Sequence, residues 1–172
     1  MAHVSYVQRD DAPEDLQATY DLIAKKMGKM LNFFKALAHS PELLTAFLAL
    51  NRTQAKTTLD PKLREMAYLR VSALNGCDYC DHYHGLAAKA VGWTDEEVAG
   101  IRRPVVAGSF SNLERDVLAF AEQVTKSCAA EDEVIARLKE SLDERQLVEL
   151  TATVALANFT NRVNVALDVE LP

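Results

Sequence analysis

Two cysteines and a histidine lie close together in the middle of the chain: Cys77, Cys80 and His84. If this segment is helical, each residue advances about 100° around the axis, so the two thiols and the imidazole share an arc of about 60°. A thiol at a helix N-terminus ionises more readily because of the exposed N–H groups and the helix dipole. A Cys-x-x-Cys pair there can close into a disulfide with little movement, and a nearby imidazole can move protons near neutral pH. The pattern therefore predicts thiol redox chemistry.

An acidic residue one helix earlier is a candidate fourth member of this site. Glu65 precedes Cys77 by twelve residues and stands among apolar residues that indicate a buried helix face. Because burial raises the pKa of a carboxyl group, we expect Glu65 to be a proton donor. A salt bridge to Arg64 or Arg70 is the plainer interpretation of this residue.

Two plainer interpretations of the cysteine pair also stay open. The first is a pair of buried structural thiols, which pack as small hydrophobic groups. The second is a structural zinc site with four possible ligands: Cys77, Cys80, His82 and His84. On a helix, however, His82 falls about 140° from Cys77 and away from the other three. We therefore expect neither a metal ion nor another cofactor. Cys128, near the end of an amphipathic helix, is expected to be a lone packing residue.

Bulk composition describes an ordinary globular protein. The 172 residues are 49% apolar and 26% charged, which suffices for one domain with a proper core. A net charge of -6 argues against nucleic acid as a partner. The chain has no apolar run long enough for a membrane span and no export signal at its start, so we expect a cytoplasmic protein whose thiols begin reduced.

Helix signals dominate the whole chain, and the strand pattern is nearly absent. Helix starts are indicated by prolines, by capping boxes and by aspartates at Pro13, Pro41, Pro61, Thr94, Ser111, Asp132 and Asp143. A further helix begins around Cys77, after a stop near Asn75-Gly76. We predict an all-α, compact bundle of seven or eight helices. Residues 1–172 are expected to form a single domain, with the motif-bearing core at about 41–125.

The candidate site resembles a known family. Four residue types at fixed spacing carry the resemblance: Glu65, Cys77, Cys80 and His84. This motif is similar to that of the AhpD-type alkylhydroperoxidases within the carboxymuconolactone decarboxylase superfamily. The stretch 158–164 resembles the last helix of the peroxidase-related branch. The resemblance covers most of the chain, residues 1–35 least.

The resemblance implies a role for each site residue. Cys80 would be oxidised to a sulfenic acid, and Cys77 would supply a proton and then form the disulfide. Glu65 and His84 would form the proton relay. One residue departs from the pattern: Tyr79 stands where AhpD has a second histidine, and a phenol is a poor base at neutral pH. Helix electrostatics alone favour Cys77 as the reactive thiol, whereas the proximity of His84 supports Cys80.

The family also implies partners. These are a hydroperoxide substrate, a thiol or dithiol reductant, and further copies of the chain in a trimer or hexamer; no nucleic acid or membrane is expected. Two alternative functions stay open. One is decarboxylation of a lactone acid, which has no need of a redox cysteine pair, and the other is a non-catalytic, redox-responsive protein of the same fold.

Several residues outside the motif have two interpretations. The apolar run Leu43–Leu50 is either core or oligomer interface. His39 is expected to be structural, with a place beside a substrate entry as the alternative. Asn161 and Arg162 on the last helix are either capping and ion-pair residues or part of the pocket.

Overall fold

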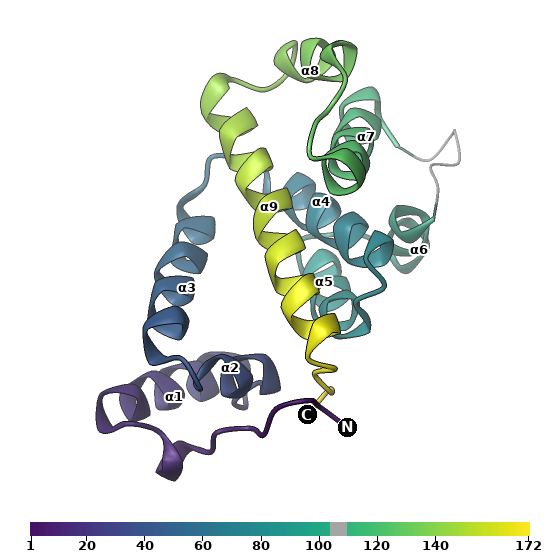
Figure 1. The fold of residues 1–172 in the computed structure, drawn as a ribbon. Helices are drawn as coiled ribbons and strands as arrows, with labels where there is room; N and C mark the ends of the chain where they lie inside the picture. The colour runs from purple at the N-terminus through teal and green to yellow at the C-terminus, as the bar shows by residue number, and fades with distance from the viewer. Residues whose placement is uncertain (104–109) are drawn as a thin grey trace. The chain divides into compact units, whose positions relative to one another are not determined.

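The computed structural model describes residues 1–103 and 110–172, and every regular element in these ranges is helical (Figure 1). The α-helices are α1 (Glu14–Met27), α2 (Asn32–Leu37), α3 (Pro41–Thr53), α4 (Pro61–Leu74), α5 (Asp78–Ala90), α6 (Asp95–Arg102), α7 (Asn112–Ser127), α8 (Asp132–Lys139) and α9 (Glu144–Ala166). Two 3-10 turns, η1 (Arg9–Asp11) and η2 (Gln54–Lys56), accompany them. The predicted all-α class is confirmed.

The helix boundaries follow the local signals in the sequence. Gly28 ends α1 at a positive φ of 76°. Thr94 and Ser111 each form a complete capping box. At the start of α9, Asp143 accepts the N–H of Gln146 at 2.8 Å. All eight expected helices are present, and α2 is an addition that the sequence did not reveal, because it is six residues long and its N-cap has no capping side chain.

The chain packs as two compact units. One contains Met1–Lys56 together with Asn164–Pro172, and the other contains Thr57–Val163. Every residue of the candidate site lies in the second unit, to which α9 belongs as far as Val163. A single domain over the whole chain stays a prediction.

In the first unit, aromatic residues form the contacts among the helices. The Tyr20 hydroxyl donates to the Val7 carbonyl at 3.0 Å, and the rings of Phe33 and Phe47 meet edge to face at 5.1 Å. His39 bonds the carbonyl of Ser5 at 2.8 Å through Nε2, which gives it a structural role within this unit.

Helix α3 buries only part of its apolar surface. Leu44 and Phe47 are buried, whereas Leu43 and Leu50 remain 42% and 50% exposed. The core interpretation is therefore confirmed for Leu44 and Phe47, whereas an interface at Leu43 and Leu50 stays a prediction. The homo-oligomer stays a prediction.

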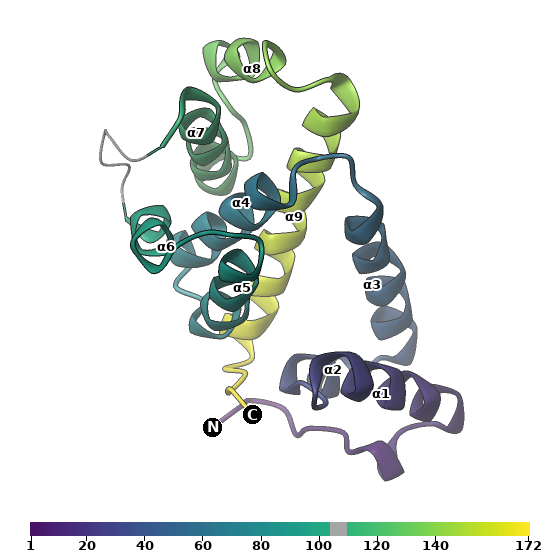
Figure 2. The same cartoon turned by 180° about the vertical axis from the view of Figure 1, so that it is seen from behind.

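In the second unit, α4 is the central helix. It packs against α5, α6 and α7, and α9 runs past α4 and α5 in both views (Figures 1 and 2). A continuous stretch of α4, residues 65–72, is buried. A helix that is buried all round must bury its polar side chains too, so Glu65 and Arg70 need partners inside the unit.

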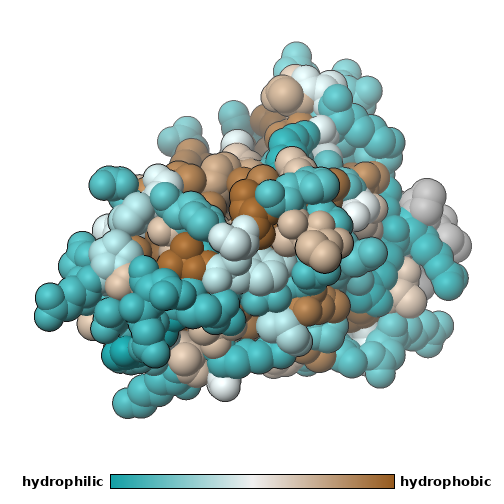
Figure 3. Space-filling view, turned by 60° about the horizontal axis from the view of Figure 1, so that its bottom comes forward, coloured by the Kyte–Doolittle hydropathy of each residue, from teal (hydrophilic) through white to brown (hydrophobic). Residues whose placement is uncertain are grey.

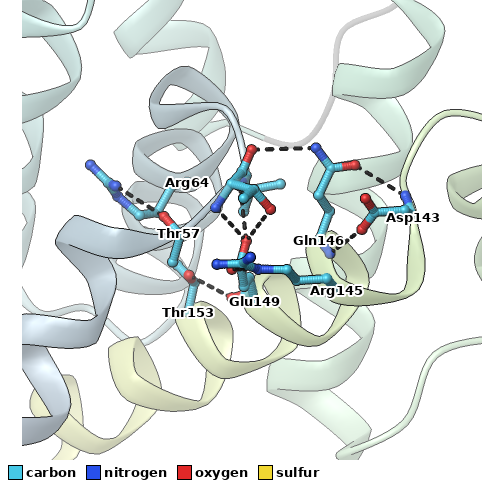
Figure 4. A network of polar contacts seen from close by, with 9 residues as sticks. Thr57, Arg64, Asp143, Arg145, Gln146, Glu149 and Thr153 are labelled. Atoms are coloured by element: carbon cyan, nitrogen blue, oxygen red, sulfur yellow. Dashed lines mark hydrogen bonds and ion pairs between the residues drawn. The ribbon is translucent and has the colours of Figure 1, made fainter.

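A carboxylate on α9 fixes the segment that leads into α4 (Figure 4). One oxygen of Glu149 accepts the backbone N–H groups of Thr58 and Leu59 at 2.8 and 2.9 Å, and the other accepts from Arg145 at 2.9 Å. Burial raises the pKa of Glu149, but these donors outweigh it and hold the pKa below its usual value. The start of α4 is thereby anchored to α9.

Arg70 ties α4 to two other helices. Its side chain is 2% exposed, and it donates to the carbonyls of Arg102 and Arg103 at the end of α6, at 3.1 and 2.9 Å. It also pairs with Glu122 of α7 at 2.5 Å. Because the last carbonyls of a helix lack partners within it, the guanidinium replaces a cap there.

The surface of the described residues differs from one expectation. Cys128 is exposed and caps the end of α7 at a positive φ of 62°, so the prediction of a packing residue is wrong. The face drawn in Figure 3 is mostly hydrophilic, with apolar residues between. Among the residues that the structure describes, no helix has the length and apolarity of a membrane span.

Replacing the buried cation tests its role in the fold. We expect Arg70→Met to lower the free energy of unfolding by roughly 2–4 kcal/mol, because the carbonyls at the end of α6 and the carboxylate of Glu122 lose a charged donor. Urea unfolding measures this loss, provided that the dependence of the unfolding free energy on urea concentration is the same in both proteins. Arg52→Met, at an exposed arginine of α3, is the matched control. Equal stability of the two variants would contradict the assignment.

Candidate active site

The two cysteines of the motif lie where α4 turns into α5. Gly76 reverses the chain at a φ of 63°, and Cys77 is the N-cap of α5. Cys77 and Cys80 form a disulfide, with their Cα atoms 5.3 Å apart. The N–H of Cys80 donates to the sulfur of Cys77 at 3.2 Å. The pair therefore occupies the first turn of a helix, where exposed N–H groups favour a thiolate.

His84 lies on the next turn of the same helix, on the side of Cys80. Its Nδ1 meets Glu65 Oε2 of α4 at 2.8 Å, which brings together the fourth residue of the motif. This bond assigns the ring proton to Nδ1 and leaves the lone pair on Nε2, so the free nitrogen is a proton acceptor. The His84 side chain is 27% exposed, and the Glu65 side chain is 10% exposed.

Glu65 is a buried carboxylate with two hydrogen-bonding partners, Arg64 and His84. Arg64 donates to Oε1 through Nη2 at 3.2 Å, while His84 occupies Oε2. Burial raises the pKa of Glu65, but His84 and then Arg64 outweigh it, and the pKa lies below its usual value. The prediction of burial is confirmed, but the predicted rise of the Glu65 pKa is wrong, because its two partners lower it. This direction favours a carboxylate that orients the imidazole over a proton donor. The plainer expectation of a salt bridge to Arg64 is also met.

A tyrosine that the sequence did not single out covers the imidazole. The ring of Tyr68 stacks on that of His84, with centroids 3.4 Å apart and planes 13° from parallel. Its hydroxyl bonds the hydroxyl of Thr160 on α9. Burial raises the pKa of Tyr68 far above its usual value, so the phenol remains uncharged. The signal for it was its spacing, three residues after Glu65 on one helix face.

Side-chain amides hold the turn that carries the cysteines. The side-chain amide of Asn75 donates to Asn158 and to Asn161, each at 3.0 Å. Asn161, fully buried, donates in turn to Ser72 at 3.2 Å. Arg162 is exposed and bonds Asn158. Of the two residues left open above, Asn161 is therefore part of the support of the site, and Arg162 braces its neighbour on the helix surface.

The remaining polar residues of α5 lie beside the site. Tyr79 is buried and hydrogen-bonds Tyr83, whose own pKa is raised by burial. His82 is exposed and meets the edge of the Tyr83 ring. The described residues contain no group of three His, Cys, Asp or Glu side chains arranged to hold a metal ion.

A contact from α6 holds a second side of α5. Arg102 pairs with Asp81 at 2.7 Å, and its guanidinium crosses Gly85 so closely that a Cβ there would lie 2.8 Å from Nη2. A side chain at position 85 would therefore displace the Arg102 guanidinium from this place.

Comparison with known proteins agrees with this architecture. Residues 41–123 match the family model of the carboxymuconolactone decarboxylase family. The protein YdfG of Bacillus subtilis (strain 168) is 26% identical over 130 residues, which span 74% of this chain and 88% of YdfG.

Solved structures share the fold over nearly the whole chain. A peroxidase-related protein of Ralstonia eutropha JMP134, described as an alkylhydroperoxidase AhpD core, has a TM-score of 0.89 at 21% identity and covers 99% of this chain and 92% of its own. The debrominase Bmp8 has a TM-score of 0.83 at 24% identity, over 98% of this chain and 91% of its own. The fold is thus AhpD-like. In its middle segment and in its fold, the chain is thus similar to the AhpD/carboxymuconolactone decarboxylase superfamily.

The lowered pKa of Glu65 predicts a pH dependence of stability. A carboxyl whose pKa is lower in the folded chain stabilises it above its unfolded pKa of about 4.3, and this contribution is lost as the pH falls through the folded value. We therefore expect Glu65→Gln to flatten the decline of the unfolding free energy below about pH 4.5. Urea titrations at several pH values measure it, with the exposed Glu42→Gln as control. An unchanged decline in Glu65→Gln would contradict this role.

Proposed function

We propose that the protein is a thiol-dependent peroxidase, which reduces a hydroperoxide through the Cys77–Cys80 couple. The observation that carries this proposal is a cysteine pair on the first turn of α5, followed by an imidazole that a buried carboxylate orients. Similarity to this superfamily supports a peroxidase-related or carboxymuconolactone decarboxylase-like function on a small molecule. The cysteine pair favours the first of these, because decarboxylation of a lactone acid has no use for a dithiol.

In the first step, Nε2 of His84 takes the proton of the Cys80 thiol. The thiolate attacks the terminal oxygen of the hydroperoxide, the O–O bond breaks, and Cys80 becomes a sulfenic acid. The alkoxide that leaves takes the proton back from His84 and departs as an alcohol. Ionised Glu65 holds the proton on Nδ1 throughout and stabilises the imidazolium, as the carboxylate does in a catalytic triad.

In the second step, Cys77 attacks the sulfur of the sulfenic acid. The S–S bond forms, and the hydroxyl group leaves as water with the proton of the Cys77 thiol. The N–H of Cys80, which contacts the Cys77 sulfur at 3.2 Å, would stabilise the attacking thiolate. An external dithiol then reduces the disulfide by exchange and supplies two electrons and two protons. The net reaction converts a hydroperoxide and a dithiol into an alcohol, water and a disulfide.

Mass spectrometry of single-cysteine variants tests the order of the two sulfurs. The reduced protein, treated with one equivalent of an organic hydroperoxide, is expected to lose two hydrogens. Cys77→Ser is expected to stop at a sulfenic acid that dimedone traps, because the resolving thiol is missing. Cys80→Ser is expected to form no such adduct, and Cys128→Ser, at the exposed cysteine, is the control and should behave as the unaltered chain.

Two results would overturn this scheme. Dimedone trapping in Cys80→Ser but not in Cys77→Ser would reverse the roles of the sulfurs. Equal peroxide consumption by the unaltered chain and by the double serine variant would exclude the peroxidase and favour a non-catalytic protein or decarboxylation.

The proton relay predicts a large effect at one histidine and none at its neighbour. We expect His84→Gln to slow disulfide formation about 100-fold or more, in the range typical of lost general acid–base catalysis. His82→Gln, two residues away on the exposed side of α5, is the matched control and should retain the rate. Stopped-flow oxidation of the reduced protein measures both, and equal rates would remove His84 from the relay.

A further inference from the structure

Two constraints, and not one, hold the imidazole of His84. Glu65 fixes the ring at Nδ1, but a single hydrogen bond still permits the ring to swing about it. The Tyr68 ring, parallel to within 13° and 3.4 Å away between centroids, covers one face of the imidazole. Together the bond and the stacked ring fix both the edge and the plane, and with them the direction of Nε2.

The stacked tyrosine is itself held by α9. The Thr160 hydroxyl donates to the Ala157 carbonyl at 3.0 Å, so its lone pair is available to accept the hydroxyl proton of Tyr68. At the other end of the residue, the Ser72 hydroxyl donates to the Tyr68 carbonyl at 3.0 Å. Tyr68 and Thr160 are both buried. The ring therefore has no freedom to slide along the imidazole.

The hydroxyl of Tyr68 serves as an anchor for the ring and not as an acid or a base. It lies at the far end of the ring, bonded to Thr160, and stays uncharged, so it can neither accept a proton from a thiol nor transfer one to a peroxide. A phenylalanine would supply the same stacking face without the anchor. The buried hydrogen bond between Tyr68 and Thr160 therefore anchors a ring that stacks on His84, a residue of the proposed catalytic site.

We propose that Tyr68, anchored by Thr160, is a positioning residue that sets the plane of the His84 imidazole for proton transfer; this rests on the peroxidase function proposed above. An imidazole that takes a proton becomes a cation, and an aromatic face stabilises a cation that lies over it. The stacked phenol therefore serves both charge states of His84 without moving.

A double-mutant cycle with His84 separates positioning from a general effect on the fold. We expect Tyr68→Leu to slow peroxide-driven disulfide formation about 10-fold, because a misplaced catalytic group loses much of its effect. In a His84→Gln background, the same substitution should slow the reaction less than twofold, since nothing remains to be positioned. An equal loss in both backgrounds would overturn the proposal.

Milder variants keep the test valid if Tyr68→Leu does not fold. Tyr68→Phe and Thr160→Val delete the same hydrogen bond, so each should slow the reaction about threefold and the double variant no more than either. Tyr20→Phe and Thr153→Val are the matched controls, because each removes a buried hydroxyl bonded to a backbone carbonyl away from the imidazole. If the rate losses of Tyr68→Phe and Thr160→Val multiply in the double variant, the two hydroxyls do not act through one hydrogen bond. Equal rate losses in the two controls would likewise contradict the role of Thr160 as the anchor of Tyr68.

NMR of the imidazole gives a readout independent of peroxide chemistry. In the unaltered chain, the His84 ring protons should be shifted upfield by the stacked Tyr68 ring, with the proton on Nδ1. Tyr68→Leu should abolish the upfield shift, and unchanged His84 shifts would refute the positioning role. If the unaltered chain consumes no hydroperoxide, the peroxidase function fails, while this spectrum still decides whether Tyr68 holds His84.

Discussion

The site depends on a buried carboxylate whose pKa lies below its usual value. Glu65 is 7% exposed, and an isolated charge at that depth would take up a proton rather than remain. The imidazole on one oxygen and the guanidinium on the other reverse that preference. The pairing has a geometric consequence as well, because a carboxylate that accepts from Nδ1 fixes the tautomer of His84. The same hydrogen bond between Glu65 and His84 therefore joins α4 to α5 and orients the imidazole.

Helix α4 carries this arrangement because its periodicity brings polar residues to several neighbours at once. Glu65 and Tyr68, three residues apart, both face His84 of α5, whereas Arg70 points to the end of α6 and to α7. A helix surrounded on all sides cannot expose any of these groups, so each must find a partner in another helix. Because α4 is central, its polar side chains pair with residues of other helices, and these pairs position the site.

Helical spacing alone predicts those features that depend on one helix. The pairing of Glu65 with His84, which depends on two helices, is expected only from the family resemblance. Cys77, Cys80 and His84 share a side of α5 because helical spacing alone places them there, and the turn at Gly76 follows from a local signal. The contact of Glu65 with His84 depends on how α4 crosses α5, which no local pattern specifies. For the same reason its pKa was predicted in the wrong direction: burial was visible in the pattern, but the nearby imidazole was not. Tyr68 was overlooked because an aromatic residue on a buried helix usually indicates core.

The support of the cysteine turn consists of neutral groups, and this suits a site whose charge changes. A dithiol that passes between thiolate, sulfenic acid and disulfide gains and loses a negative charge within the first turn of α5. Charged supports would be attracted or repelled at each step and would shift the turn. The amides of Asn75, Asn158 and Asn161 carry no net charge, and they are held by partners on α4, α7 and α9. The charged pair, Glu65 with Arg64, lies instead on the imidazole side, where the proposed chemistry needs a charge that never leaves.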